Sequence, residues 1–363
     1  MITQNADFLS SLFQQTYLVT GGAGFIGSTA VAQMVHAGAH VVVVDALTYA
    51  GFRENLEWIP SHPHNGSYEL VEGSITDGAL ISQLLAHHRP SAIINFAAES
   101  HVDNSIESPS QFMHTNIIGT YTMLEAARHY WNHLEAGEKE AFRFIQISTD
   151  EVYGSLGETG KFHEEYPMQP NSPYSASKAA GDHLARAWFH TYGLPTIITN
   201  CTNNYGPRQY PEKLIPLMIH HALAGKDLPI YGDGRNIRDW IHVEDHCMGV
   251  LRALTLGTVG ESYGFGGNAE KANMDVVHNI CDLLDEIRPR PQGGSYREQI
   301  RFVKDRLGHD RRYAIDDSKA IRELGFMRSH DFSHGIRATI TWYLDNQAWC
   351  ESVTRDAAHK RAA

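Results

Sequence analysis

The sequence has few cysteines and no recognisable metal-binding motif. Its four cysteines, at positions 201, 247, 281 and 350, are far apart and form no Cys-x-x-Cys pair. This spacing excludes a zinc ribbon and a disulfide-stabilised scaffold. The 22 histidines show no His-Glu-x-x-His or similar ligand spacing, so no metal site is predicted. We expect ordinary thiols in a reducing cytoplasm.

Basic residues are also in deficit, with 30 Lys and Arg against 42 Asp and Glu and a net charge of −12. Nucleic acids and anionic membranes both attract basic surfaces, so the balance argues against either partner. No Lys or Arg precedes Arg53, so the basic start of a secretory signal is missing. Hydrophobic runs such as residues 41–44 are far too short to cross a bilayer. We therefore expect a cytoplasmic protein.

What the sequence does contain is a regular alternation of strands and helices. Its 363 residues are 42% hydrophobic with a mean hydropathy of −0.34, as expected for a globular chain of about two domains. We predict strands at 17–20, 41–44, 92–96, 142–147 and 196–200, and helices at 28–37, 79–88, 110–131 and 172–192. This order predicts an α/β fold with a doubly wound parallel sheet of the Rossmann type. From about residue 203 the elements shorten, which indicates a smaller, interleaved α/β domain.

A glycine-rich turn separates the first predicted strand from the first helix. Gly21, Gly24 and Gly27 form Gly-x-x-Gly-x-x-Gly, which suits a tight turn that a pyrophosphate approaches closely. The next helix offers its positive N-terminus to that anion. Asp45 ends the following strand, where a carboxylate binds the adenosine ribose and disfavours a 2′-phosphate, so NAD is favoured over NADP. A ligand-free turn, with Asp45 as a helix cap, is the alternative.

A tyrosine and a lysine lie four residues apart at positions 174 and 178. Ser172 or Asn171 can cap this helix and Pro173 suits its first turn. The spacing places Tyr174 and Lys178 on one helical face, where the ammonium would lower the phenol pKa and make Tyr174 a base. Lys178 could also hold the nicotinamide ribose. A surface Tyr–Lys pair is the alternative.

A second polar cluster, Thr149, Asp150 and Glu151, follows the predicted strand 142–147. The carboxyl ends of parallel strands face the ligand crevice of a doubly wound sheet. Thr149 could bind a substrate hydroxyl there, while the two carboxylates could act as an acid and a base with separated pKa values. A solvated Asp-Glu turn is the alternative.

Together these motifs resemble the extended short-chain dehydrogenase/reductase family, and within it the nucleotide-sugar 4,6-dehydratases. The resemblance runs from about residue 17 to about residue 325. Besides the glycine-rich turn and the Tyr174/Lys178 pair, the segments that carry it are 45–51, 97–103, 148–154, 203–207, 211–216, 238–240 and 308–314.

The resemblance implies a three-stage reaction on a nucleoside-diphosphate sugar, with dTDP-glucose favoured, in deoxysugar biosynthesis such as that of rhamnose. Tyr174 would take the C4 hydroxyl proton as hydride passes to NAD, and Glu151 would remove the C5 proton while Asp150 protonates the departing C6 hydroxyl. Hydride return to C6 would give a 4-keto-6-deoxy sugar, with tightly bound NAD recycled each turnover. The presence of Asp150 favours a 4,6-dehydratase over a 4-epimerase. The alternatives are a UDP- or CDP-hexose 4,6-dehydratase, a 4-epimerase, or a non-enzymatic NAD-binding regulator.

The resemblance also implies which residues bind each ligand. Those expected at the cofactor are Gly21, Gly24, Phe25, Ile26, Gly27, Asp45, Ala46, Leu47, Thr48, Ser74, Ile75, Phe96, Ala97, Ala98, Ser100, Thr115, Tyr174, Lys178 and Asn204. Those expected at the substrate are Ser100, His101, Thr149, Asn203, Lys213, Leu214, Pro229, Tyr231, Arg238, Asn273, Arg306 and His309. The segment 301–312, with a net charge of +3, is expected to meet the diphosphate.

Two further expectations follow from the resemblance. Residues 1–202 and about 237–262 would form the NAD-binding domain, and about 203–236 and 263–363 the nucleotide-sugar domain. The helices 110–131 and 172–192 would pair with those of a second copy in a homodimer.

Overall fold

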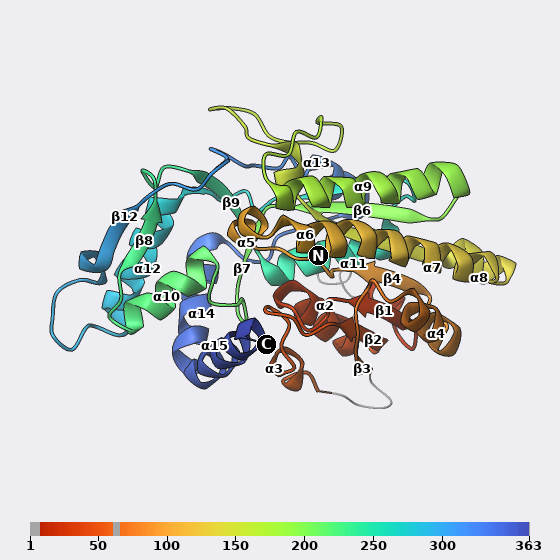
Figure 1. Cartoon of the computed structure of the whole chain (residues 1–363), viewed down its shortest axis with the longest axis horizontal. Helices are drawn as coiled ribbons and strands as arrows, with labels where there is room; N and C mark the ends of the chain where they lie inside the picture. Colours follow the sequence, from red (N-terminus) through yellow and green to blue (C-terminus); the bar gives the residue numbers. More distant parts are fainter. Residues whose placement is uncertain (1–7, 61–65, 363) are drawn as a thin grey trace.

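A seven-stranded sheet organises the larger part of the chain in the computed structural model, which describes residues 8–60 and 66–362 (Figure 1). The strands follow the spatial order β10-β6-β5-β4-β1-β2-β3, and every neighbouring pair is parallel. Their bounds are β1 (Thr16–Thr20), β2 (His40–Asp45), β3 (Ser67–Glu72), β4 (Ala92–Asn95), β5 (Arg143–Thr149), β6 (Thr196–Cys201) and β10 (Ser262–Phe265). The predicted α/β fold class is confirmed.

Helices cover both faces of this sheet, which is why its strands are almost continuously apolar. Successive side chains of a strand point to opposite faces, so Leu18 and Val42 pack with α4 and α7, whereas Val19 and Val43 pack with α2 and α11. The helices of this part are α2 (Phe25–His36), α3 (Glu54–Glu57), α4 (Gly78–His88), α5 (Val102–Glu107), α6 (Pro109–Phe112), α7 (Thr120–Asn132), α8 (Ala136–Ala141), α9 (Pro173–Tyr192), α11 (Val243–Leu256) and α13 (Ser318–Leu324).

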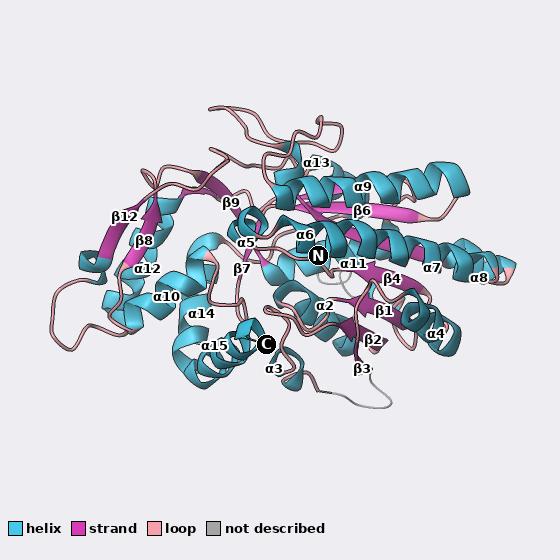
Figure 2. Ribbon diagram, viewed as in Figure 1, coloured by secondary structure: helices cyan, strands magenta, loops and turns pink. Residues whose placement is uncertain are grey.

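The rest of the chain forms a smaller lobe around its own apolar cluster (Figure 2). It contains a three-stranded sheet of order β11-β9-β7 and the parallel pair β12-β8. The strands are β7 (Asn203–Tyr205), β8 (Leu228–Tyr231), β9 (Ile237–His242), β11 (Glu270–Ala272) and β12 (Ile300–Val303). The helices are α10 (Leu214–Leu223), α12 (Asn273–Ile287), α14 (Phe332–Asp345), α15 (Gln347–Ala362) and the 3₁₀ turn η3 (Tyr296–Gln299).

The structure alters the predicted elements in two places and agrees with them in a third. The helix expected at 110–131 is three segments, because the π-helix η1 (Met113–Gly119) separates α6 from α7. Strand β3 was not predicted at all, since its residues are only partly buried and carry two glutamates. The helix beginning at Pro173 agrees with the sequence, and Ser172 caps it by accepting from Ser175 N.

The proposed domain boundary at residue 262 also needs correction. Strand β10 is the edge strand of the large sheet, and α13 packs on β10 and α11. Ala320, Leu324 and Phe326 accordingly belong to the apolar core of the large sheet. Part of the segment 263–363 therefore packs with the dinucleotide half and not with the smaller lobe.

In the part of the chain that the structure describes, no helix is both long and apolar enough to span a bilayer. All four cysteines are buried and free.

Candidate active site

A cavity of about 780 Å³ opens where the strand order reverses, between β1 and β4. Its walls include the residues that follow the carboxyl ends of β1, β4, β5 and β6 and reach across to the smaller lobe. In open parallel sheets this reversal point is where ligands bind, because adjacent loops diverge there. The sheet topology therefore explains why chemically distinct motifs far apart in sequence share one cavity.

The glycine-rich turn lies at one end of the cavity and fits a dinucleotide. Gly21 has φ +67°, and a Cβ on Gly27 would come 2.1 Å from the Gly21 carbonyl oxygen, so neither position accepts a side chain. The turn leads directly into α2, whose first-turn N–H groups carry the positive end of the helix dipole. Asp45 accepts from Ala23 N at 2.9 Å and from Leu47 N at 2.8 Å. Its carboxylate therefore fixes the turn.

We expect Gly27→Ala to lose bound NAD. Crowding by the added methyl group against the Gly21 carbonyl costs about 1–3 kcal/mol, which is roughly a 10- to 100-fold weaker affinity. NAD content of the purified protein and its Kd by calorimetry measure the effect. Gly137→Ala in α8 is the matched control, because a Cβ there meets nothing within 4 Å. Equal NAD affinity in the two variants would refute the role of Gly27.

Tyr174 and Lys178 both line the cavity from the first two turns of α9, as predicted from their spacing. Their electrostatics differ from the prediction. Burial, followed by the nearby Glu151 and Cys201, raises the pKa of Tyr174 well above its usual value, and a hydrogen bond with Thr149 opposes this only in part. Lys178 Nζ donates to the Ile147 carbonyl at 2.6 Å. The expected lowered pKa of Tyr174 is therefore wrong for this structure.

Thr149, Asp150 and Glu151 occupy the end of β5 and the 3₁₀ turn η2 (Asp150–Tyr153). Thr149 and Glu151 line the cavity, whereas Asp150 lies buried behind its wall, with Oδ1 3.4 Å from Thr149 Oγ1. Asp150 Oδ2 has no hydrogen-bond partner among the residues that the structure describes. The prediction of two carboxylates facing the crevice therefore holds for Glu151 alone.

Different surroundings act on the two carboxyl groups. Burial, then the neighbouring Glu151 and Asp239, raises the pKa of Asp150 well above its usual value. Burial also raises the pKa of Glu151, but the positive charges of Arg238, Lys213 and Arg306 oppose that rise. The surroundings of Asp150 thus favour its protonated form, whereas the three cations near Glu151 favour its ionised form. Acid and base chemistry at one site requires such a difference between two carboxyl groups.

Cationic side chains face Glu151 from the smaller lobe. Arg238 stacks on the Tyr313 ring at 4.3 Å, and Arg306 pairs with Asp103, with Nε 2.6 Å from Oδ1. Lys213 Nζ donates to the Ser100 carbonyl at 2.7 Å. Of the five basic residues in 301–312, only Arg306 lines the cavity. Arg306 and His309 are therefore the predicted binding residues of this segment that lie where a diphosphate could reach them, and their contact with it stays a prediction.

Nearly all of the residues predicted for cofactor and substrate lie in this one cavity wall. The exception among them is Leu47, which has φ +48° and packs against the core of the large sheet. The predicted residues that line the cavity are Gly21, Gly24, Phe25, Ile26, Gly27, Asp45, Ala46, Thr48, Ser74, Ile75, Phe96, Ala97, Ala98, Ser100, His101, Thr115, Thr149, Glu151, Tyr174, Lys178, Asn203, Asn204, Lys213, Leu214, Pro229, Tyr231, Arg238, Asn273, Arg306 and His309.

The sequence did not single out two buried residues that support the site. Asp182 lies one turn beyond Lys178 on α9, accepts from Ser148 Oγ at 2.6 Å, and has its pKa raised to about 7 by burial. Asn116, in the π-helix, exchanges hydrogen bonds with the backbone of Glu99 and donates to Ser177 Oγ. The spacing of four from Lys178 could have indicated Asp182, whereas no local pattern indicated Asn116.

Sheet topology, glycine turn and the Tyr174/Lys178 pair define a dinucleotide-binding enzyme of the short-chain dehydrogenase/reductase type. The family model described as GDP-mannose 4,6 dehydratase matches residues 18–339, and the chain belongs to this family.

Similar proteins are found among characterised sequences and solved structures. A dTDP-glucose 4,6-dehydratase of Xanthomonas campestris pv. campestris (strain B100) is 56% identical over 93% of this chain and 95% of its own. The dTDP-glucose 4,6-dehydratase 1 of Escherichia coli (strain K12) is 53% identical over 94% and 96%. The dTDP-glucose 4,6-dehydratase of Streptomyces venezuelae, solved with NAD and TYD bound, has a TM-score of 0.83 and 43% identity, covering 93% of this chain and 99% of that one.

Proposed function

We propose that this chain catalyses the NAD-dependent dehydration of dTDP-glucose to dTDP-4-keto-6-deoxyglucose and water, a hydro-lyase reaction of deoxysugar biosynthesis. The observation that carries the proposal is the pair of carboxyl groups at the end of β5, Asp150 and Glu151, directly beside Tyr174. Oxidation and reduction at C4 alone would need no such pair, whereas elimination of water needs both a base and an acid.

Bound NAD would supply reversible hydride transfer, from C4 of the sugar and back to C6. The glycine turn, Asp45 and Lys178 would hold it, and the crowding around Gly21 and Gly27 supports that fit. Tyr174 takes the proton of the C4 hydroxyl, which Thr149 helps to orient through its hydrogen bond with Tyr174. Because Tyr174 is protonated at neutral pH in this structure, the base form requires an added positive charge close to the phenol.

Glu151 and Asp150 divide the elimination between them. Glu151 is favoured as the base that removes the C5 proton, since three cations favour its ionised form. A proton must return to C5 as hydride reaches C6, and the protonated Glu151 would supply it. Asp150 keeps its proton and supplies it to the departing C6 hydroxyl. Its carboxyl group lies behind the wall, so the side chain must turn toward the substrate or pass the proton through Thr149 Oγ1.

Charge at the smaller lobe supports binding of a diphosphate. We expect Arg306→Gln to raise KM for dTDP-glucose by about 10- to 100-fold, because a hydrogen bond to a charged group contributes about 1.5–3 kcal/mol. The kcat at its optimal pH should change much less than KM, because Arg306 touches no reacting atom in this assignment and acts on Glu151 only through its charge. Initial rates over a range of dTDP-glucose concentrations measure both constants.

Arg311→Gln is the control for this prediction. Arg311 belongs to the same basic segment, but it pairs with Asp233 at the surface and does not line the cavity. The KM of Arg311→Gln for dTDP-glucose should stay within twofold of the wild-type value. Equal increases in the two variants would contradict a local role for Arg306.

The proposed reaction is tested by incubating the NAD-loaded protein with dTDP-glucose and following the nucleotide sugar by mass spectrometry. Loss of one water supports the proposal, and an unchanged mass with inversion at C4 would identify an epimerase instead. A panel of dTDP-, UDP-, CDP- and GDP-hexoses gives the base preference. No change in any sugar would indicate an NAD-binding protein without this activity.

The proposal also includes the division of the chain into domains, its location in the cell and its oligomeric state. The NAD-binding half would comprise residues 1–202 and about 243–265 with α13, because β9 (Ile237–His242) belongs to the sheet of the smaller lobe. Most of the remainder would bind the nucleotide sugar. The four free cysteines support a cytoplasmic location.

A homodimer would use α7 and α9, which run side by side (Figure 1) and expose Ile118, Tyr121 and Tyr192 on or next to them. Light scattering of wild type and Ile118→Glu tests it: a monomeric wild type would refute the dimer.

A further inference from the structure

Helix α15 of the smaller lobe reaches across to α3 of the large lobe (Figure 1). Trp349 Nε1 donates to Asn55 Oδ1 at 3.1 Å, and Ser352 Oγ donates to Glu54 Oε1 at 2.9 Å. Trp349 and Ser352 do not line the cavity, so α15 can affect a bound cofactor only through the residues that it contacts. Asn55 is the residue of α3 that extends this contact toward the cavity.

Asn55 is hydrogen-bonded to the glycine-rich turn itself. Its Nδ2 donates to the Ala23 carbonyl at 2.8 Å, and both residues are buried. The orientation of the amide follows from its partners, because an indole N–H can only donate and a carbonyl can only accept. The same carbonyl accepts from Phe52 N at 3.1 Å, while Ala23 N donates to Asp45 Oδ2 at 2.9 Å. Two hydrogen bonds in series therefore connect Trp349 with the turn.

An apolar cluster holds α15 in this position. Phe52 and Val353 are almost fully buried against each other, and Trp349 and Tyr210 pack on them. The Tyr210 ring lies 5.4 Å from that of Phe52 and also lines the cavity. Burial of these side chains stabilises the docked helix through the hydrophobic effect. The docked helix then keeps the indole N–H of Trp349 directed at Asn55.

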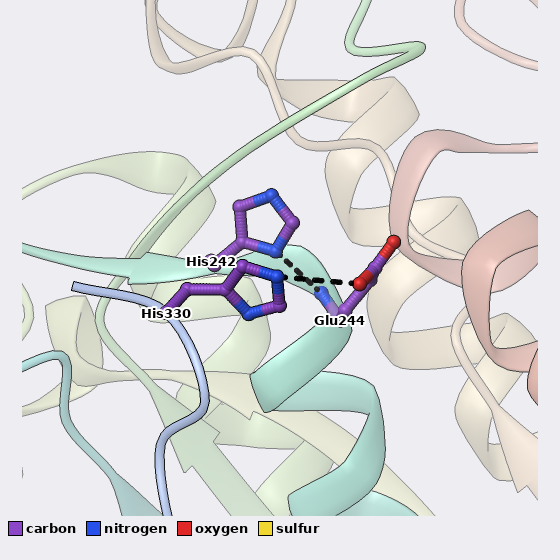
Figure 3. A group of neighbouring side chains, drawn as sticks. All are labelled: His242, Glu244 and His330. Carbon is purple, nitrogen blue, oxygen red and sulfur yellow. Dashed lines mark hydrogen bonds and ion pairs between the residues drawn. The ribbon is translucent and has the colours of Figure 1, made fainter. Parts of the chain in front are cut away.

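The segment that leads into α14, the helix before α15, is fixed separately to α11 (Figure 3). The His330 ring stacks on that of His242 with centroids 3.9 Å apart, and its Nε2 lies 3.4 Å from Glu244 Oε2. The Asp245 carboxylate accepts from the backbone N–H groups of Ser329 and His330. These contacts hold the start of α14 without any help from α15. A change at the contact between α15 and α3 should therefore leave the rest of the smaller lobe in place.

We propose that Trp349 is a positioning residue for NAD. Through Asn55 it holds the Ala23 carbonyl, and so keeps the glycine-rich turn in the conformation that fits a pyrophosphate. Docking of α15 thereby slows the release of NAD. Retention serves the proposed reaction, because its oxidation and its reduction must use the same bound cofactor. The inference rests on the NAD binding in the proposed function, and it does not depend on which sugar is the substrate.

The test measures the release of NAD with no sugar present. Protein loaded with radiolabelled NAD is diluted into excess unlabelled NAD, and the bound label is followed with time. Trp349→Phe keeps an aromatic ring but loses the N–H donor, so it should release NAD about five- to tenfold faster than wild type, the effect of one lost hydrogen bond. Trp131→Phe is the matched control, because Trp131 is also half-buried and donates to the Lys139 carbonyl at 2.9 Å, but does not line the cavity. Its release rate should stay within about twofold of wild type, since it is not coupled to the turn.

A double-mutant cycle separates this role from a general loosening of the fold. Asn55→Ala should release NAD at least as fast as Trp349→Phe, and Trp349→Phe made in that background should add little, because the two residues act through one series of hydrogen bonds. If Trp349→Phe releases NAD no faster than Trp131→Phe, or if the effects of Trp349→Phe and Asn55→Ala multiply, α15 only joins the two lobes and the proposal is overturned. A wild-type protein that retains NAD but does not dehydrate dTDP-glucose would refute the proposed function and leave this result intact.

Discussion

Replacing Tyr174 with Phe should lower kcat for dehydration of dTDP-glucose by about 10²–10⁴-fold, the range that a positioned acid or base contributes. The substitution removes one oxygen from a buried side chain and leaves the ring, which packs edge to face on Phe112. The helix α9 and the glycine turn are untouched, so NAD content and substrate Kd should stay within about twofold of wild type. Steady-state rates and calorimetry measure these quantities.

The stage at which this variant stops is part of the prediction. Because Tyr174 would act at the first oxidation, Tyr174→Phe mixed with dTDP-glucose should show no absorbance of reduced nicotinamide. Tyr263→Phe provides the control. Tyr263 is buried on β10 and its hydroxyl accepts from Thr258 N, but it does not line the cavity. Near-normal turnover by Tyr174→Phe, or an equal loss in Tyr263→Phe, would contradict the assignment.

Replacing Glu151 with Gln should give the opposite spectroscopic result. The substitution keeps the size of the side chain and removes the base that would take the C5 proton, so kcat should again fall by about 10²–10⁴-fold. Oxidation at C4 does not need Glu151 in this assignment. Reduced nicotinamide should therefore accumulate on the enzyme after dTDP-glucose is added, and stopped-flow absorbance measures its formation and decay.

Glu158→Gln controls for the loss of a negative charge, since Glu158 is exposed and outside the cavity. It should turn over at the wild-type rate with no accumulated reduced nicotinamide. If Glu151→Gln shows no reduced cofactor, the division between oxidation by Tyr174 and elimination by Glu151 is wrong.

The pH profile gives a further expected result from the same pair of carboxyl groups. Glu151 acts only when ionised and its pKa is raised, so wild-type kcat should fall as pH drops through a value above that of an ordinary glutamate. Asp150 acts only when protonated, and the raised pKa of its carboxyl group keeps it so to higher pH; kcat should therefore fall again on the alkaline side. Both apparent values belong to the coupled pair.

In Glu151→Gln the acid-side fall should disappear from the residual rate. The alkaline limb should move to lower pH, because the Glu151 charge is the largest contribution after burial to the raised pKa of Asp150. If both limbs of the Glu151→Gln pH profile match those of wild type, groups other than Glu151 and Asp150 set the pH dependence of kcat.

The sequence by itself determined the features that depend on residues close together in the chain. Glycines at 21, 24 and 27 predict the turn because only glycine tolerates its crowding and positive φ. The Ser172 cap, the four-residue spacing of Tyr174 and Lys178, and the apolar strands covered on both faces are likewise set within short segments. Regular alternation of these segments was enough to predict the doubly wound sheet, since βαβ handedness leaves few alternatives.

Tertiary structure alone decided where each charged group points and what surrounds it. Lys178 donates to the Ile147 carbonyl and Asp150 lies behind the wall, because strand β5 and helix α9 pack closely and bury both side chains. Arg306 reaches the cavity while Arg311, five residues later, pairs at the surface. Burial and long-range charge set the pKa values, and neither is readable from local spacing.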